Sequence, residues 1–296
     1  MKVAITGASG LVGRALVRNL RGDDHQVVRL VRREPAGPDE ARWDPYASVD
    51  DKALEGADAV VHLAGAGIGD HRWTESYKRQ IRDSRTAGTR TLTEALAGLT
   101  AKPKVLVSGS GMNFYGDTGD RAAVETDPKG EGFLADVVRD WEAATAPAAA
   151  AGIRVVYVRS GHVLARDGGL LGRILPLFRL GLGGRLGSGR QWMSWIARDD
   201  HIAALRFLID RDDIAGPVNL TSPNPVTNAQ FTKALGHALH RPAPFIAPAF
   251  ALRLALDGLA EEGALLDLRL APARLTEAGF TFRHPDLDAA LRHVLA

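Results

Sequence analysis

The sequence predicts an α/β protein with an open, doubly wound parallel sheet and a smaller C-terminal lobe. Over the first 165 residues, short runs rich in valine, isoleucine and leucine alternate with longer stretches of helical periodicity. A glycine-rich turn joins the first apolar run to the first helical stretch. After residue 165 the sequence becomes rich in glycine and proline, which indicates that the regular alternation ends there.

The first turn has the composition of a phosphate-binding site. Val3 to Ile5 form a short β-rich run, and Gly7, Gly10 and Gly13 follow before a helical pattern begins. Glycines in such a turn allow a sharp bend, close approach of a ligand and tight helix–strand packing. The helix N-terminus then offers free N–H groups to a pyrophosphate. We expect a dinucleotide here; the alternative is a purely structural turn, because the spacing is G-x-x-G-x-x-G rather than G-x-G-x-x-G.

The second predicted strand, Gln26 to Val31, ends at two arginines. Sites that prefer NAD usually place an acidic residue here for the ribose 2′-hydroxyl, whereas an arginine accommodates a 2′-phosphate. Arg32 and Arg33 precede the first acid, Glu34. The sequence therefore predicts NADP(H) as the cofactor, and the alternative is that both arginines are solvated loop charges.

The bulk composition excludes several classes of protein. The 296 residues include no cysteine, which excludes disulfides, cysteine nucleophiles and thiolate metal sites. No His or carboxylate cluster has metal-ligand spacing, so we predict no metal. The net charge of +2 is spread along the chain, so no nucleic-acid partner is expected. No apolar run is long enough for a membrane span and no export signal is visible, so we expect a cytoplasmic protein without a membrane partner.

The remaining elements are expected to place polar groups at the carboxyl ends of the strands, where an open α/β sheet binds its ligands. His62 lies inside the third strand, and we interpret it as a core histidine. Ser108 and Ser110 follow the next strand. The elements predicted from these patterns are strands at 58–64, 104–107 and 154–158 and helices at 51–54, 71–100 and 133–151.

We divide the chain into two parts. Residues 1–165 are predicted to form the NADP-binding domain, and residues 194–222 return to it with a helix and a short strand. Residues 166–193 and 223–296 are predicted to form the substrate-side lobe. Within this lobe, the glycine-rich, apolar stretch 168–187 is expected to be a loop folded over a pocket.

Several motifs resemble one known family over nearly the whole chain. The sequence resembles the extended short-chain dehydrogenases/reductases, which have a Rossmann-like fold. It is most similar to their atypical NAD-dependent epimerase/dehydratase-like group, called "epimerase family" proteins, part of which carries an old cell-division-inhibitor label. The motifs that carry the resemblance are the glycine turn 6–13, His62 to Gly65, Arg82 to Arg85, Ser108 to Ser110, Phe178 to Gly184, Gly187 to Gln191, Trp195 to Ile196 and Pro272 to Leu275.

The resemblance implies a set of cofactor contacts. On the pyrophosphate and the 2′-phosphate they are Gly7, Ser9, Gly10, Leu11, Val12, Arg32 and Arg33. On the adenosine side and from the long helix they are Leu63, Ala64, Gly65, Gln80 and Arg85. Around the nicotinamide they are Ser108, Ser160, Gly161 and His162.

One departure from the family concerns its chemistry. Active members use a tyrosine as acid/base four residues before a lysine, and no tyrosine of this chain has that lysine. Phe133 and Val137 occupy the corresponding positions, and neither side chain can carry a proton. The candidate catalytic substitutes are Ser110, Tyr115 and His162, although the last two are equally explained as a packed aromatic and a pocket wall. The candidate substrate contacts are Asn113, Gln191, Trp192 and Ser194.

Three functions are compatible with these observations. The first is an NADP(H)-dependent oxidoreductase acting on a small carbonyl or imine substrate. The second is a non-redox isomerase, dehydratase or cyclase that retains the cofactor, and the third is a catalytically idle NADP(H) sensor. An enclosed cavity with polar groups over Ser110 would favour an enzyme, whereas an apolar filling would favour the sensor. Relatives often dimerise, so a homodimer is expected from the resemblance.

Overall fold

An eight-stranded sheet forms the centre of the molecule, with the strand order β12-β7-β6-β5-β1-β2-β3-β4. The computed structural model describes all 296 residues. Every neighbouring pair in this sheet is parallel except β3 and β4. The strands are β1 (Lys2–Thr6), β2 (Gln26–Val31), β3 (Glu40–Asp44), β4 (Ser48–Val49), β5 (Ala59–His62), β6 (Val105–Gly111), β7 (Arg154–Ser160) and β12 (Gly216–Leu220). The predicted doubly wound α/β fold is therefore confirmed.

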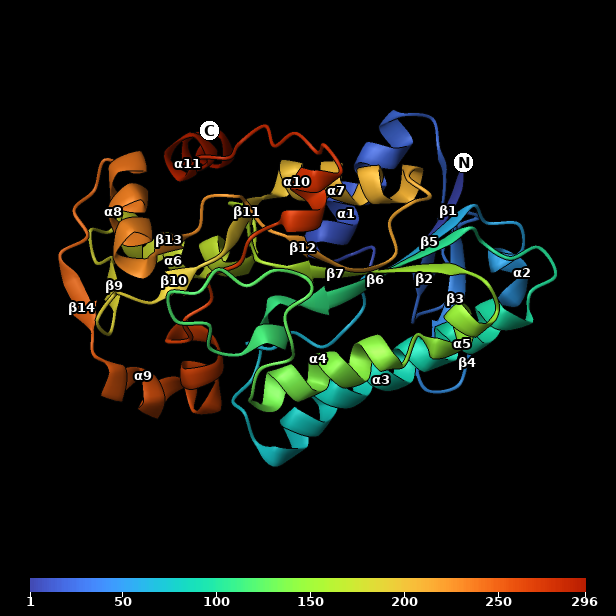
Figure 1. The fold of residues 1–296 in the computed structure, drawn as a ribbon, viewed down its shortest axis with the longest axis horizontal. Helices are drawn as coiled ribbons and strands as arrows, with labels where there is room; N and C mark the ends of the chain where they lie inside the picture. Colours follow the sequence, from blue (N-terminus) through green and yellow to red (C-terminus); the bar gives the residue numbers. More distant parts are fainter.

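Helices cover both faces of the sheet because successive strand residues point to opposite sides. Val3 and Ile5 of β1 pack into one core cluster, and Ala4 between them packs into the other. The first cluster is covered by α1 (Leu11–Gly22), α7 (Arg198–Asp210) and α10 (Ala273–Glu277). The second is covered by α2 (Asp51–Leu54), α3 (Glu75–Gly98) and α5 (Ala146–Ala150), next to α4 (Phe133–Ala143). Figure 1 shows α1, α7 and α10 above the sheet and α3 and α4 below it.

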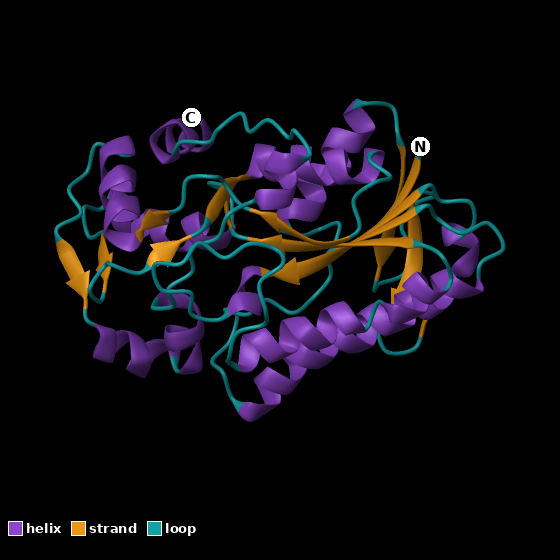
Figure 2. Cartoon of the chain, viewed as in Figure 1, coloured by secondary structure: helices purple, strands orange, loops and turns teal.

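A second group of elements lies beside the carboxyl ends of these strands (Figure 2). Its helices are α6 (Gly169–Arg179), α8 (Asn228–Ala238), α9 (Ala249–Leu256) and α11 (Leu287–Leu295). Its strands form three short pairs, β8 (His162–Leu164) with β11 (Trp195–Ala197), β9 (Gly184–Leu186) with β14 (Phe245–Ala247), and β10 (Trp192–Met193) with β13 (Val226–Thr227). Short helical turns lie at η1 (Met112–Tyr115) and η2 (Ala260–Ala264). A separate core cluster holds α6, α8 and α11 together.

The structure corrects three predicted elements. The stretch predicted as a loop at 168–187 contains helix α6, because Leu171, Leu175 and Phe178 recur at helical spacing and are buried. The helix predicted at 133–151 is two helices, α4 and α5, and the second begins at a turn with a proline in its first positions. Strand β3 lies between the predicted strand 26–31 and the predicted helix 51–54, where we predicted no element.

Strand β12 joins the main sheet beside β7, in the segment that we expected to return to the first domain. The division of the chain into two domains stays a prediction. No helix in the structure combines the length and the apolar character that a membrane crossing needs.

Candidate active site

The glycine turn between β1 and α1 forms a tight cradle. Gly7 has φ +66°, and a Cβ there would lie 2.7 Å from the carbonyl carbon of Leu63. A Cβ on Gly13 would lie 2.2 Å from the carbonyl oxygen of Gly7. No side chain caps α1, and the backbone N–H groups of Leu11 and Val12 have no acceptor in the protein. Free donors at a helix N-terminus suit a pyrophosphate, so the turn fits the predicted dinucleotide.

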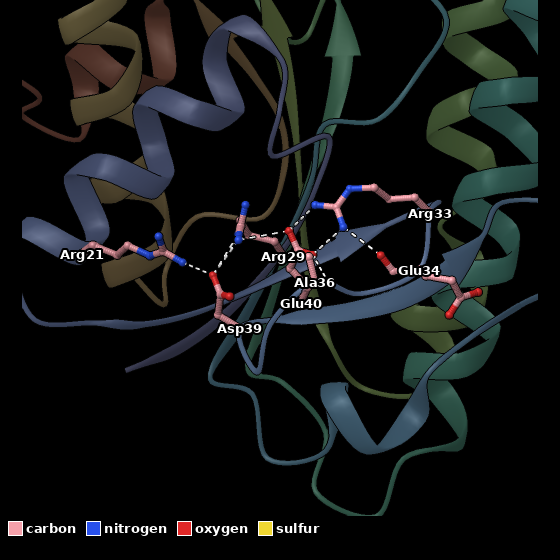
Figure 3. A network of polar contacts seen from close by, with 7 residues as sticks. All are labelled: Arg21, Arg29, Arg33, Glu34, Ala36, Asp39 and Glu40. Carbon is pink, nitrogen blue, oxygen red and sulfur yellow. Dashed lines mark hydrogen bonds and ion pairs between the residues drawn. The ribbon is translucent and has the colours of Figure 1, made fainter.

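The two arginines after β2 are in different situations. Arg33 donates two hydrogen bonds to Glu40, at 2.7 and 2.6 Å, and this carboxylate also accepts from the backbone N–H of Ala36 (Figure 3). The hydrogen bonds from Arg33 hold the pKa of Glu40 below its usual value. Arg32 is exposed and makes no hydrogen bond or ion pair. Arg32 is therefore the guanidinium free for a 2′-phosphate, whereas Arg33 stabilises the loop beside it.

The end of β5 is fixed by hydroxyl contacts. Thr6 Oγ1 accepts from the backbone N–H groups of Leu63 and Ala64, at 3.1 and 3.3 Å. His62 is fully buried between Thr6 and Thr89, with ring nitrogens 2.7 and 3.0 Å from the two hydroxyl oxygens. The interpretation of His62 as a satisfied core histidine therefore agrees with its contacts.

A cleft of about 330 Å³ opens between the start of α1, next to the glycine turn, and the carboxyl ends of β6 and β7. It brings together predicted residues from distant segments: Leu11, Val12, Arg85, Ser110, Asn113, Ser160, Gly161 and His162. The rest of its lining is mostly apolar and includes Ile68, Met112, Leu134, Val137, Val138, Trp141, Val163 and Leu170. A mainly apolar cleft with a few converging polar groups is the usual form of a small-molecule site.

Arg85 and Asn113 are held in place at the wall of the cleft. Arg85 donates to the carbonyl oxygen of Ala66 at 3.0 Å and lies over the Trp141 ring, 5.0 Å from its centroid. Burial lowers the pKa of Arg85 to about 10. Asn113 Nδ2 donates to the carbonyl oxygen of Glu262 at 2.7 Å, which leaves the amide oxygen free to accept from a ligand.

Tyr115 does not reach the cleft. Its side chain is 2% exposed, its hydroxyl donates to Asn219 Oδ1 at 2.7 Å, and the same oxygen accepts from Arg159 at 2.9 Å. Burial raises the pKa of Tyr115 to about 12. The role of proton donor that we predicted for Tyr115 therefore has no support in the geometry.

Four further residues predicted at the site lie elsewhere. Ser194 is fully buried and bonds the backbone of Leu268 and Leu270. Gln191 donates to two backbone carbonyls, and the Trp192 indole donates to Asp120. Ser108 is fully buried inside β6. Each of these four side chains makes a hydrogen bond within the protein, and none of them lines the cleft.

The last predicted contacts differ in exposure. Ser9 and Gly65 are exposed beside the glycine turn, where a bound nucleotide can reach them. Gln80 is exposed on α3 and does not line the cleft. Ser160 lines the cleft, and its hydroxyl oxygen lies 2.8 Å from His201 Nε2.

His162 lines the cleft as a neutral imidazole. Burial lowers the pKa of His162 to about 4, so at neutral pH the ring carries no proton to donate as a cation. Its backbone N–H donates to the carbonyl oxygen of Ser194 at 2.8 Å, which fixes the start of β8.

Phe133 and Val137 stand where other family members have the catalytic tyrosine and lysine. Val137 lines the cleft, and Phe133 packs edge-on against Trp73, with ring centroids 5.4 Å apart.

Sequence reasoning missed two residues behind Ser110. Ser110 Oγ donates to Glu142 Oε1 at 2.6 Å. Arg159 donates to both oxygens of Glu142 at 2.9 Å, and both side chains of this ion pair are largely buried. An arginine inside the apolar strand Arg154–Ser160 signals that a counter-ion must lie nearby, because a buried charge needs a partner. The sequence does not indicate that this partner is Glu142 on α4.

Comparison with known proteins agrees with this geometry. Residues 3–220 match the NAD dependent epimerase/dehydratase family, and residues 247–294 match a domain of unknown function. The epimerase family protein ML0860 of Mycobacterium leprae is 47% identical over 292 residues, which cover 98% of this chain and 94% of that protein. The Bacillus subtilis epimerase family protein YfhF is 34% identical and covers 100% of this chain.

Two crystal structures are similar over the whole chain. The human epimerase family protein SDR39U1, solved with NADPH, has a TM-score of 0.89 and 31% identity, and 99% of each chain is covered. A Corynebacterium glutamicum structure described as a nucleoside-diphosphate sugar epimerase has a TM-score of 0.83 and 42% identity, and this chain covers 58% of it. The family match confirms the predicted class of cofactor, a nicotinamide dinucleotide. The chain belongs to the NAD-dependent epimerase/dehydratase family, among the atypical extended short-chain dehydrogenases/reductases known as epimerase family proteins.

Proposed function

We propose that this protein is an NADP(H)-dependent oxidoreductase that interconverts a small, largely apolar carbonyl or imine and the corresponding alcohol or amine. The observation that carries the proposal is the cleft, which is lined both by Leu11 and Val12 next to the glycine turn and by Ser110 of β6. A substrate in this cleft lies beside the place where the family holds its nicotinamide. The apolar lining favours a substrate without charged groups.

The chain's own residues would hold the cofactor at both ends. The free N–H groups at the start of α1 would bind the pyrophosphate, and the exposed Arg32 would bind the 2′-phosphate. Ser160, Gly161 and His162 line the cleft and would contact the nicotinamide. The bound nicotinamide supplies the hydride acceptor or donor, and the protein positions the substrate and handles the proton.

The cleft also separates this proposal from the two alternatives. A catalytically idle sensor has no need of a cavity whose wall carries Ser110, Asn113 and His162. A non-redox isomerase or dehydratase needs an acid or base that titrates near neutral pH. Burial lowers the pKa of His162 to about 4, and Tyr115 lies outside the cleft, so neither of these two side chains is available as the acid that such a reaction needs.

The first test is equilibrium binding of NADPH and NADH to the purified protein. We expect NADPH to bind more tightly, and Arg32→Glu to weaken NADPH binding by about tenfold to 100-fold, because a charge-assisted bond to a phosphate is lost. NADH affinity should change little. Arg292→Glu reverses another exposed, unpaired arginine on α11 and is the matched control. Equal affinities for NADPH and NADH, or an equal effect of both substitutions, would contradict the assignment.

The second part of the test measures hydride transfer. A panel of short-chain apolar ketones, aldehydes, imines, alcohols and amines is incubated with the appropriate form of the cofactor, and absorbance at the NADPH band is followed. Turnover of at least one pair by the wild type, and its loss in Ser110→Ala, would support the proposal. Conversion of a substrate to an isomer without net change in the cofactor would favour the non-redox alternative instead.

A further inference from the structure

The hydroxyl of Ser110 is committed to a partner inside the protein. Its hydrogen points at Glu142 Oε1, 2.6 Å away, and a serine hydroxyl has only this one hydrogen to donate. Ser110 is nevertheless half-buried and lines the cleft, where a ligand can approach its oxygen. A substrate can therefore donate a hydrogen bond to Ser110 Oγ but cannot accept one from it.

The direction of this hydrogen bond is fixed by the ion pair behind it. Arg159 binds Glu142 in a bidentate manner, at 2.9 Å to each oxygen. Only 4% of the Arg159 side chain and 12% of the Glu142 side chain are exposed. Arg159 is itself held by the Tyr115 hydroxyl, at 2.9 Å, and its guanidinium carbon lies 3.5 Å from the centroid of the Phe114 ring. Both oxygens of Glu142 act as acceptors in these contacts, so the hydrogen between Ser110 and Glu142 belongs to Ser110.

Resting on the function proposed above, we infer that Ser110 and Glu142 form a proton-accepting pair that selects the alcohol or amine form of the substrate. A hydroxyl or amine hydrogen of the ligand can donate to Ser110 Oγ. A carbonyl oxygen placed there would face the lone pairs of Ser110 and be repelled. The site would then work as a dehydrogenase on a small, apolar alcohol or amine.

The proton has a defined route in this reaction. As the substrate O–H or N–H bond breaks, its proton passes to Ser110 Oγ, and the hydrogen of Ser110 passes to Glu142 Oε1 along the 2.6 Å contact. The substrate carbon loses a hydride at the same time, and the oxidised NADP⁺ is the acceptor, so the substrate loses two electrons and two hydrogens. Glu142 ends protonated and Ser110 unchanged. Ser110 touches the substrate and is catalytic; Arg159 acts through Glu142 and is a positioning residue.

The test compares two ligands that differ only in this group, cyclohexanol and cyclohexanone. Their dissociation constants from the NADP⁺-loaded protein are measured by ligand-observed NMR, which requires no turnover. We expect the wild type to bind cyclohexanol more tightly by about fivefold to tenfold, the value of one hydrogen bond of the right polarity. Ser110→Ala should remove the preference and leave the two constants within about twofold, since neither lone pair nor donor remains.

A second variant tests the proton route. In Glu142→Gln the amide oxygen should take the place of Oε1, because both Ser110 Oγ and Arg159 Nε donate there. We expect this variant to keep the preference for cyclohexanol but to lose hydride transfer, since an amide cannot take up the proton. If this variant does not fold because Arg159 has lost its counter-ion, the comparison of the wild type with Ser110→Ala still shows whether Ser110 causes the preference for cyclohexanol.

The possible results distinguish failure of the proposed function from failure of the inference about Ser110 and Glu142. Absence of NADP⁺ binding would overturn the proposed function. Normal NADP⁺ binding with cyclohexanone bound at least as tightly as cyclohexanol, or with neither ligand bound, would overturn the inference alone.

Discussion

The two ends of the cleft are built in different ways. The cofactor end comes from one continuous stretch, residues 7–13, and works through backbone: a glycine at φ +66°, close contacts that exclude a Cβ, and uncapped N–H groups. The substrate end is assembled from three elements, with Ser110 on β6, Glu142 on α4 and Arg159 on β7. It works through side-chain charges that are buried and paired. The first end can be predicted from residues that are neighbours in the sequence, whereas the residues of the second end come together only when the chain folds.

The substrate end should be the more costly one to damage. Arg159→Leu leaves Glu142 buried without its counter-ion, so we expect a loss of about 3–5 kcal/mol in the free energy of unfolding. Urea denaturation followed by circular dichroism measures this loss. Arg139→Leu is the matched control, because the ion pairs of Arg139 are exposed and contribute little to stability. Equal effects of the two substitutions would show that the pair with Glu142 is not desolvated.

The cofactor end should be sensitive to a single methyl group. Gly13→Ala places a Cβ 2.2 Å from the carbonyl oxygen of Gly7, and this atom belongs to the backbone. We expect a loss of about 1–3 kcal/mol or more in unfolding free energy, together with weaker NADPH binding. Gly22→Ala in the same helix is the control, since no atom lies within 4 Å of the added Cβ. This change should stabilise α1 by about 0.5–1 kcal/mol. If Gly13→Ala changed neither the unfolding free energy nor NADPH binding, the backbone of the turn would be able to move away from the added methyl group at little cost.

The same contrast explains which parts of the site the sequence could predict. The glycine turn and strand β2 follow from residues close together in the chain, and the structure has both elements where we predicted them. Tyr115 was chosen for its chemistry and its closeness in sequence to Ser110, but the η1 turn points its hydroxyl at Asn219, more than 100 residues away. Gln191 and Ser194 failed similarly, since their partners lie on segments whose position only the tertiary fold determines.

Helix α6 shows a different limit of prediction. Its glycines and Pro176 suggested a loop, but the buried stripe of Leu171, Leu175 and Phe178 packs into the core cluster of the second group of elements. Tertiary burial outweighs the low helix propensity of these glycines and this proline.

Two histidines should make the protein less stable in acid: His62, which is fully buried beside Thr6, and His162, which is half-buried in the wall of the cleft. Burial lowers the pKa of His62 and of His162 from 6.5 to about 4. In the unfolded chain these rings take up a proton as the pH falls below about 6.5, and in the folded protein they do so only near pH 4. The stability that they contribute is therefore complete above about pH 6.5 and is lost as the pH falls toward 4, by about 1.4 kcal/mol per pH unit for each ring.

His162→Leu separates the contributions of the two histidines in this experiment. It should reduce the slope of unfolding free energy against pH by about 1.4 kcal/mol per pH unit between pH 6.5 and 4, because one proton-binding group of the unfolded chain is gone. The contribution of His62 remains, since Thr6 and Thr89 still hold that ring. His237→Leu is the control: water solvates this exposed imidazole on α8 in both states, so the slope should stay that of the wild type. Urea denaturation over this pH range gives the slopes. If His162→Leu and His237→Leu had the same slope, His162 would be solvated in the folded protein, and the cleft wall would be more open than its packing indicates.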